Sequence, residues 1–363
     1  MVCFRVKVAV FVSFLSIAFA FETALANPTK KFQIANWSGG PTFDERTKQF
    51  SDCSAETSNS RRISISYSVN RKYLWSLTFY NSDWNFSPGH SFNVNLRIND
   101  REMPNQRAVI MGTNRLKVQL INSIAFFDAL RTAGKLQVHT GGLTFDFNLN
   151  ASNQVLVALV KCVTQQSNRS RSSVSKNRAV KRPEANKSPA MTADPTIVAE
   201  ATALATQLTT YLNIDKSQVL APKDIPREVE GAAVWKAGAV LGTVDIFGSN
   251  SGATIDDVPS NIVDQDALKC QREFFAAAAP DLLNRSNVVR VFTTCRMAST
   301  TAFKYYLGIP RGKGGYYLLR TSTDEFESPL LIHRSAKDLD DKISAVIMTI
   351  LSKFEFPTAA VPE

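Results

Sequence analysis

Residues 63–79 read ISISYSVNRKYLWSLTF and contain two runs in which apolar and polar residues alternate. Every second position of each run is apolar: Ile63, Ile65, Tyr67 and Val69 in the first, and Tyr73, Trp75, Leu77 and Phe79 in the second. A period of two places these side chains on one face of a strand. The Asn70-Arg71 pair between the runs is typical of a turn. The stretch therefore predicts an antiparallel strand pair with one buried face.

The segments after this pair extend the pattern. Residues 92–98 resume the alternation, which predicts an antiparallel meander with the two earlier strands. Further strands are expected near 109–111 and 116–120, then a helix over 121–133, a hairpin over 136–149 and a helix from Ser152 to Cys162. The sequence thus predicts a β-rich, sandwich-like antiparallel domain over residues 31–164.

The end of this region carries a resemblance to a known family. The residues concerned are the Pro88-Gly89 turn, the helix residues Phe127 to Leu130, the phrase Leu143, Phe145, Phe147, Leu149 and Ser152, and the helix to Cys162. Their order is similar to that of the invasion-associated locus B family of small exported bacterial proteins. The region departs from that family because it contains no second cysteine pair. The resemblance implies a periplasmic or envelope-associated β-rich module without known catalytic residues.

The C-terminal part predicts a second domain over residues 195–356. Asp194 before Pro195 is typical of a helix start, and apolar residues recur at helical spacing as far as Leu212. Strands are expected at 232–235, 239–247, 288–295, 303–309 and 316–321, and a polar loop at 248–260. A long amphipathic helix is expected from Ser335 to Phe354. Helices beside an antiparallel sheet indicate the α+β class.

Charge is concentrated between the two predicted domains. The net charge is +10, and the segment from Arg169 to Lys187 holds seven basic residues and one acid, Glu184. Residues 165–194 are rich in Ser, Asn and Pro and show no periodicity, which predicts a flexible tether. The alternative is a polybasic patch for anionic envelope polymers. Nucleic acid is not an expected partner, because the segment has no aromatic residues on which bases could stack.

The first 26 residues are typical of a secretory signal peptide. Arg5 and Lys7 precede an apolar run over 8–20, and Ala24-Leu25-Ala26 fits a cleavage site. The protein is therefore expected to be periplasmic or secreted, with membrane contact only through the signal segment. An uncleaved N-terminal anchor is the alternative.

Export places the remaining cysteines in an oxidising compartment. Cys53, Cys162, Cys270 and Cys295 permit three connectivities. We favour Cys53 with Cys162 and Cys270 with Cys295, because each pair then joins two parts of one domain. No metal site or cofactor is expected, since the chain has no CxxC pair and only three histidines.

The C-terminal hairpin offers the one set of tentative binding residues. Gly308 to Gly315 is expected to be a turn, because a phosphate-binding loop needs Ser or Thr after its lysine and a helix next. The candidates are Tyr305, Tyr306, Arg311, Lys313, Tyr316 and Tyr317. The two cations could hold an anion at the turn, and half of the tyrosines are expected to face solvent as a binding surface. The acids at 256, 257, 264 and 266 are expected to be solvated loop residues rather than a calcium site.

No catalytic signature appears, so the sequence favours a non-enzymatic, two-domain envelope protein that binds a protein or an anionic polymer. The first alternative is an exported hydrolase with its site near Arg311, Lys313 and the Asp256 loop. The second is a structural protein that assembles with its own copies. The sequence leaves the oligomeric state open.

Overall fold

The computed structural model describes residues 31–59, 63–103, 106–120, 124–140, 143–177, 194–212, 217–226, 229–238, 240–248, 254–280, 288–296 and 301–323. The predicted signal peptide, residues 178–193 of the predicted linker and the predicted helix over 335–354 lie outside these ranges. The described residues fall within one compact unit, Lys31–Glu363.

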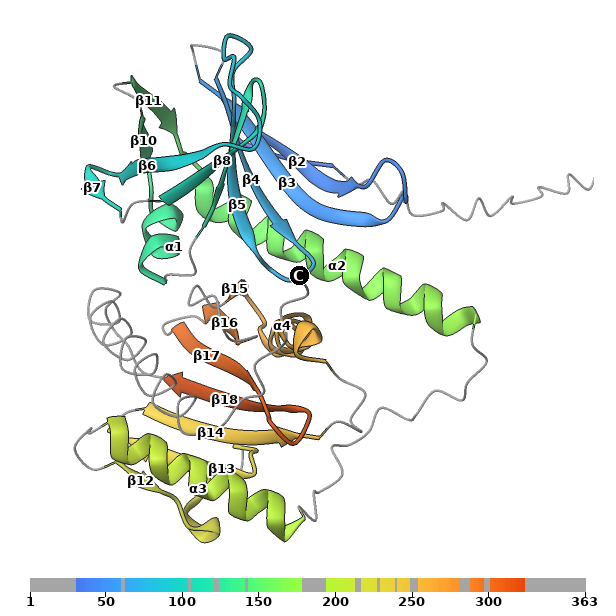
Figure 1. Cartoon of the computed structure of the whole chain (residues 1–363), viewed down its shortest axis with the longest axis vertical. Helices are drawn as coiled ribbons and strands as arrows, with labels where there is room; N and C mark the ends of the chain where they lie inside the picture. The colour runs from blue at the N-terminus through green and yellow to red at the C-terminus, as the bar shows by residue number, and fades with distance from the viewer. Residues whose placement is uncertain are drawn as a thin grey trace, which may run out of the picture. The chain divides into compact units, whose positions relative to one another are not determined.

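The first sheet has eleven antiparallel strands (Figure 1). They are β1 (Phe32–Ile34), β2 (Trp37–Phe43), β3 (Phe50–Ser58), β4 (Ser64–Asn70), β5 (Trp75–Tyr80), β6 (Ser91–Ile98), β7 (Arg101–Glu102), β8 (Gln106–Gly112), β9 (Arg115–Gln119), β10 (Lys135–Thr140) and β11 (Leu143–Asn148). The predicted pair over 63–79 is present as β4 and β5, with Ser66 opposite Thr78 and Tyr67 opposite Leu77.

The strand order corrects the predicted meander. The order is β1-β2-β3-β4-β5-β9-β8-β6-β10-β11, with β7 beside β6. The hairpin of β8 and β9 therefore lies between β5 and β6, which do not pair. Residues 81–90 make this possible, because they lead the chain from β5 across the positions that β9 and β8 take in the sheet, before β6 begins. Alternation predicts the buried face of each strand but not its neighbour.

Two helices accompany the first sheet: α1 (Ile124–Arg131) and α2 (Ser152–Asn177). α2 packs against β2, β3 and β4 and is joined to β3 by the disulfide Cys53–Cys162. Trp37 stacks on Tyr67 at 4.8 Å between ring centroids, and both are fully buried. The predicted helix to Cys162 is thus confirmed. The helix continues to Asn177, inside the predicted linker over 165–194.

The second sheet has seven antiparallel strands in the order β12-β13-β14-β18-β17-β16-β15. They are β12 (Gln218–Val219), β13 (Ala233–Ala237), β14 (Val240–Phe247), β15 (Glu273–Pro280), β16 (Val289–Arg296), β17 (Thr301–Pro310) and β18 (Tyr316–Thr323). The helices are α3 (Pro195–Leu212), which packs on β13 and β14, and α4 (Val258–Lys269), which packs on β16. Short 3₁₀ turns occupy η1 (Pro222–Asp224) and η3 (Ile255–Asp257).

The α+β class is confirmed, and so are both predicted disulfides, Cys53–Cys162 and Cys270–Cys295. The predicted polar loop over 248–260 is wrong at its end, because α4 begins at Val258 after a capping box formed by Thr254 and Asp257. Within the described part of the chain, no helix combines the length and the apolar character needed to span a membrane.

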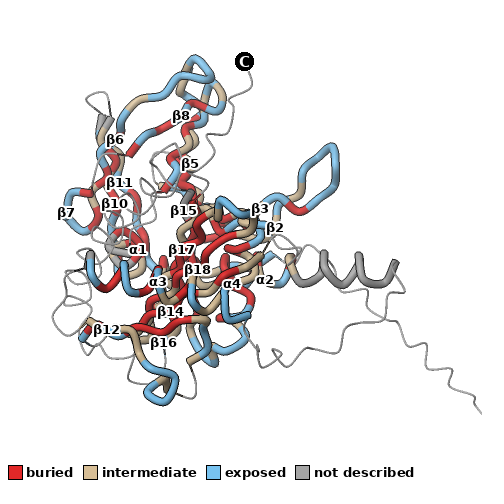
Figure 2. Tube along the Cα trace, turned by 60° about the horizontal axis from the view of Figure 1, so that its bottom comes forward, coloured by how far each residue is buried: buried red, intermediate tan, exposed pale blue. Residues whose placement is uncertain are grey.

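One hydrophobic core includes residues of both sheets. It contains Trp75 of β5, Phe127 of α1, and Phe275 and Phe292 of the second sheet. Phe127 lies 5.2 Å from Phe275 and 5.6 Å from Phe292, between ring centroids. Buried positions in Figure 2 are concentrated where strands meet helices, and the loops at strand ends are exposed. The two regions thus share packing, while their division into separately folding domains stays a prediction.

Candidate functional site

The predicted tyrosine surface is divided between the two faces of the second sheet. Tyr306 of β17 donates a hydrogen bond to Asp266 of α4 at 2.7 Å, and Tyr317 of β18 donates to Glu200 of α3 at 2.6 Å. Ile309 lies opposite Tyr317, so Tyr306 and Tyr317 point to opposite sides. The four tyrosines therefore do not form one surface.

Burial also corrects the expectation that half of these tyrosines face solvent. Tyr306, Tyr316 and Tyr317 are 7%, 5% and 9% exposed, and Tyr305 is half-buried. Tyr316 stacks on Phe247 at 4.8 Å, and Tyr305 lies 6.3 Å from Phe292, both measured between ring centroids. These rings therefore pack against neighbours within the chain.

Arg311 is held by an acid on α3. Its Nε donates to Glu200 Oε1 at 2.8 Å and its Nη2 donates to Oε2, which makes a bidentate pair. The hydrogen bond from Arg311 lowers the pKa of Glu200 to about 2, and Tyr317 adds to this lowering. The pair ties the β17–β18 turn to α3. Lys313 at the tip of that turn is exposed, so it alone of the two cations is open to a ligand. A binding role for these residues stays a prediction.

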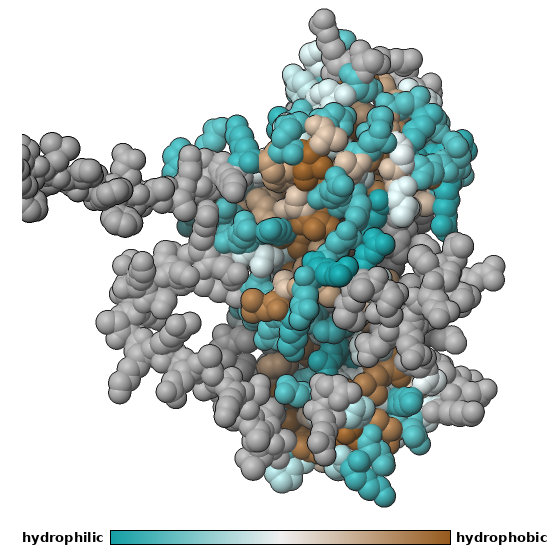
Figure 3. Space-filling view, turned by 180° about the vertical axis from the view of Figure 1, so that it is seen from behind, coloured by the Kyte–Doolittle hydropathy of each residue, from teal (hydrophilic) through white to brown (hydrophobic). Residues whose placement is uncertain are grey.

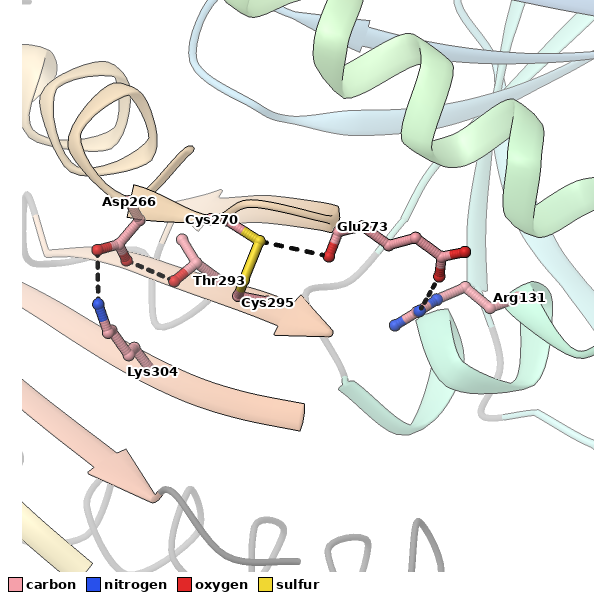
Figure 4. Close-up of a disulfide and its surroundings, with 7 residues drawn as sticks. All are labelled: Arg131, Asp266, Cys270, Glu273, Thr293, Cys295 and Lys304. Atoms are coloured by element: carbon pink, nitrogen blue, oxygen red, sulfur yellow. Dashed lines mark hydrogen bonds and ion pairs between the residues drawn. A yellow bond between two sulfur atoms is a disulfide. The ribbon is translucent and has the colours of Figure 1, made fainter. Parts of the chain in front are cut away.

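Asp266 belongs to a buried polar cluster, which corrects its assignment to a solvated loop (Figure 4). It lies on α4 and is 7% exposed. Its carboxylate accepts hydrogen bonds from Thr293 at 2.6 Å, from Tyr306 at 2.7 Å and from Lys304 at 2.8 Å. Burial is the main cause that raises the pKa of Tyr306, and the charge of Asp266 raises it further. The cluster anchors α4 to β16 and β17.

The other acids near Asp266 also bond to side chains of the protein. Asp264 is buried, on the same helix, and accepts a long hydrogen bond from Tyr73 of the first region at 3.4 Å. Asp256 pairs with Lys72 at 2.7 Å on the surface. The Asp257 carboxylate accepts hydrogen bonds from the backbone N–H and the hydroxyl of Thr254, which form the capping box of η3. In the described ranges, no group of three or more His, Cys, Asp or Glu side chains could hold a metal ion.

A different feature of the structure is open to a partner: the outward face of the first sheet. The five adjacent strands β4, β5, β9, β8 and β6 contain four charged residues, and all four are basic: Arg97, Arg107, Arg115 and Lys117. In the other strands of this sheet the acidic residues are Asp52 and Glu56 of β3, Glu102 of β7 and Asp146 of β11, and the loops next to the five strands add Asp83 and Asp100. Arg97 lies opposite Glu102, so its charge is partly balanced.

We call the outward side chains of Arg107, Arg115, Lys117, Val109 and Met111 the basic strand face. Lys117 lies between Thr78 of β5 and Val109 of β8 in one cross-strand row, and Arg115 lies opposite Tyr80. Their neighbours along the strands, among them Leu116, Val118, Ala108 and Ile110, point the other way and are buried. The face is therefore the solvent side of a strand set whose other side is core.

Within the described part of the chain, no acid neutralises the cations of this face. Among the described residues, Arg107, Arg115 and Lys117 form no ion pair with an acid, although Arg107 donates to Ser91 Oγ at 3.1 and 2.8 Å. That contact holds the Arg107 guanidinium along the sheet. A rise of about 3.4 Å per strand residue separates the backbone positions of Arg115 and Lys117 by about 6.8 Å, and adjacent strands lie about 4.8 Å apart. Arg107, Arg115 and Lys117 are thus close enough for one partner with several neighbouring anionic groups to contact all three.

Sequence reasoning missed this face, although a signal for it exists. The stretch Arg115-Leu-Lys-Val-Gln-Leu120 alternates like 63–79, and its polar positions begin with two cations. The expectation of strands at 109–111 and 116–120 used the apolar positions alone. Arg107 and Lys117 are brought near each other by the β8–β9 pairing, in which Val109 lies opposite Lys117, and the apolar positions alone do not give this register.

Comparisons with known proteins identify a structural likeness. No protein-family model matches the chain, and no curated protein matches it. Among solved structures, invasion associated protein B from Bartonella henselae aligns over 37% of this chain and 96% of that chain, with 14% sequence identity and a TM-score of 0.28.

Proposed function

We propose that this chain is an exported, non-enzymatic protein of the cell envelope that binds an envelope protein or an anionic envelope polymer. The observation that carries the proposal is the set of five adjacent strands whose charged residues are all basic. A partner of negative charge would meet no acid on these five strands.

The construction of the face suits a binding role. Its strands are fixed from behind by a continuous core that includes Leu77, Leu116 and Val118. Among the described residues, Arg107, Arg115 and Lys117 form no ion pair with an acid, so a partner of negative charge could contact them without breaking one. Sites on rigid strands hold their side chains more accurately than sites on loops do.

The two disulfides support an extracytoplasmic location. Such bonds persist in the periplasm and outside the cell, whereas cytosolic thiols are kept reduced. This fits the predicted signal peptide, and the periplasmic or secreted assignment remains part of the proposal.

The geometry favours binding over the alternative of a hydrolase in the second region. Three groups named for that alternative, Arg311, Asp256 and Asp257, each bond to a side chain that supports the fold. Lys313 is the member left exposed. A binding function needs no rearrangement of these contacts.

The test uses the full chain as recovered from the expressing cell, added to separated envelope fractions: membranes, wall polymer and envelope proteins. The variant carries R107Q, R115Q and K117Q together. The control carries R46Q, K223Q and K236Q, which removes the same charge from exposed positions elsewhere. Binding that is lost in the variant and kept in the control supports the proposal. Absence of binding to every fraction refutes it.

A further inference from the structure

The basic strand face also carries exposed apolar side chains. The large hydrophobic residues that are exposed in the described chain are Val109, Met111 and Leu268, and the first two lie on β8. Val109 is 37% exposed and Met111 is 56% exposed. On the side seen in Figure 3, hydrophobic residues form small patches bordered by hydrophilic ones. Two apolar side chains beside three cations make a surface of mixed character.

The hairpin geometry places these apolar residues beside the cations. Val109 lies directly opposite Lys117. The β8–β9 register shifts between Ile110 and Gly112, so Met111 has no partner on β9, while Gly112 lies opposite Arg115. A bulge of this kind redirects the side chain of the extra residue. Met111 therefore projects from the sheet between the positions of Arg115 and Lys117 along the hairpin.

From this combination we propose that the basic strand face docks on a membrane surface that carries anionic phospholipid headgroups. The inference rests on the proposed binding function, but it replaces the protein or polymer partner with a membrane surface and departs from the expectation that membrane contact occurs only through the signal segment. Arg107, Arg115 and Lys117 would contact the headgroup phosphates, and Met111 and Val109 would enter the boundary between headgroups and acyl chains. A soluble anionic polymer would use the cations but would offer the two apolar side chains nothing to contact.

The typical contribution of one cation to membrane binding gives the expected loss of vesicle affinity. A Lys or Arg near an anionic membrane strengthens binding by a factor of about five, so removal of three weakens it about 100-fold. The electrostatic part falls as salt rises, because the Debye length shortens from about 10 Å at 0.1 M to about 3 Å at 1 M ionic strength. The apolar part does not fall in this way.

The experiment measures co-sedimentation of the full chain with vesicles of phosphatidylcholine alone and of phosphatidylcholine mixed with phosphatidylglycerol. We expect binding only to the mixed vesicles. R107Q/R115Q/K117Q should weaken it about 100-fold, and V109S/M111S should weaken it several-fold at unchanged charge. The control R46Q/K223Q/K236Q should bind nearly as the parent does, and circular dichroism checks that each variant folds.

Three results would overturn the inference. One is equal binding to neutral and mixed vesicles, and another is full binding by the V109S/M111S variant. The third is that the full chain binds soluble polyphosphate through Arg107, Arg115 and Lys117 but does not bind vesicles. In that third case the proposed function stands with a polymer as partner. Loss of binding to every envelope fraction would instead refute the proposed function itself.

Discussion

Trp75 donates its indole N–H to the backbone carbonyl of Ala276 at 3.0 Å, which joins β5 of the first sheet to β15 of the second. The same indole lies 5.3 Å from Phe275, between ring centroids. Close by, the amide of Ala278 donates to the carbonyl of Tyr73 at 2.9 Å. β15 is an edge strand, and edge strands attract further pairing unless they are covered. The end of the β4–β5 hairpin therefore protects this edge and couples the two regions.

The first prediction concerns this coupling. Trp75→Ala should lower the free energy of unfolding by about 3–5 kcal/mol, because it removes a fully packed ring and leaves a buried carbonyl unpaired. Urea unfolding followed by near-UV and far-UV circular dichroism should show a single transition shifted to lower urea. Trp84→Ala is the control, since Trp84 is half-buried and contacts Phe86 and Phe145 of the first region. Two separate transitions in the parent chain would show that the regions fold independently, as the sequence predicts.

The sequence could predict the strand faces of this fold but not the contacts between its regions. Tyr73 and Trp75 are recognised as buried from alternation alone. Whether they are buried against α2, against β15 or against a further chain depends on partners far along the sequence. Apolar side chains carry no information about which apolar surface they meet, because the hydrophobic effect is non-directional.

The second prediction concerns the Asp266 cluster. Asp266→Asn should destabilise the fold by about 3–5 kcal/mol, because it leaves Lys304 without its anion in a largely buried site. Asp256→Asn is the matched control: its ion pair with Lys72 is exposed, and such pairs contribute about 0–1 kcal/mol. Midpoints of urea unfolding at neutral pH compare the two variants. Equal shifts would contradict the buried role of Asp266.

The position of Asp266 was beyond sequence reasoning for a physical reason. The helix that carries it has Pro259 in its first turn and two acids among its apolar residues, so it lacks a clear amphipathic pattern. The sequence predicts Asp264 and Asp266 to lie in a loop, because Asp, Asn and Ser are common in turns. Asp266 can be buried because Thr293, Lys304 and Tyr306 donate hydrogen bonds to its carboxylate. These three residues lie on strands much later in the sequence, so the sequence around Asp266 does not reveal them.

The third prediction concerns the pH dependence of stability through Glu200. Its pKa in the folded protein is about 2, lowered chiefly by Arg311 from the ordinary 4.5. A depressed carboxyl pKa contributes stability that is complete above the unfolded pKa and is lost as pH falls toward the folded pKa. The contribution should therefore decline between pH 4.5 and 2. Glu200→Gln should flatten the decline of the unfolding free energy in this window, and Glu56→Gln at an exposed position serves as the matched control substitution. A parallel decline in E200Q would refute the assignment.

The fourth prediction compares the two disulfides. Cys53–Cys162 spans 109 residues and Cys270–Cys295 spans 25. Loop entropy then predicts losses of roughly 4.7 and about 3.5 kcal/mol when each bridge is removed. Double replacement by Ala, with urea unfolding under non-reducing conditions, measures each loss. Both losses should be large, and a greater loss for the shorter loop would show that native contacts outweigh loop length here.

The last prediction concerns the β17–β18 turn, where glycine is required by space and not by conformation alone. Gly315 has φ +81°, and a Cβ at this position would lie 1.8 Å from the carbonyl oxygen of Phe247, which is backbone and cannot give way cheaply. Gly89 has a similar φ of +86°, but a Cβ there would meet no atom within 4 Å. An alanine in the left-handed region costs about 1–2 kcal/mol in either place. Gly315→Ala should therefore lower the melting temperature more than Gly89→Ala does. Because the same turn carries Arg311 to Glu200, the damage should extend to α3, and E200Q should then add less to G315A than to the parent chain.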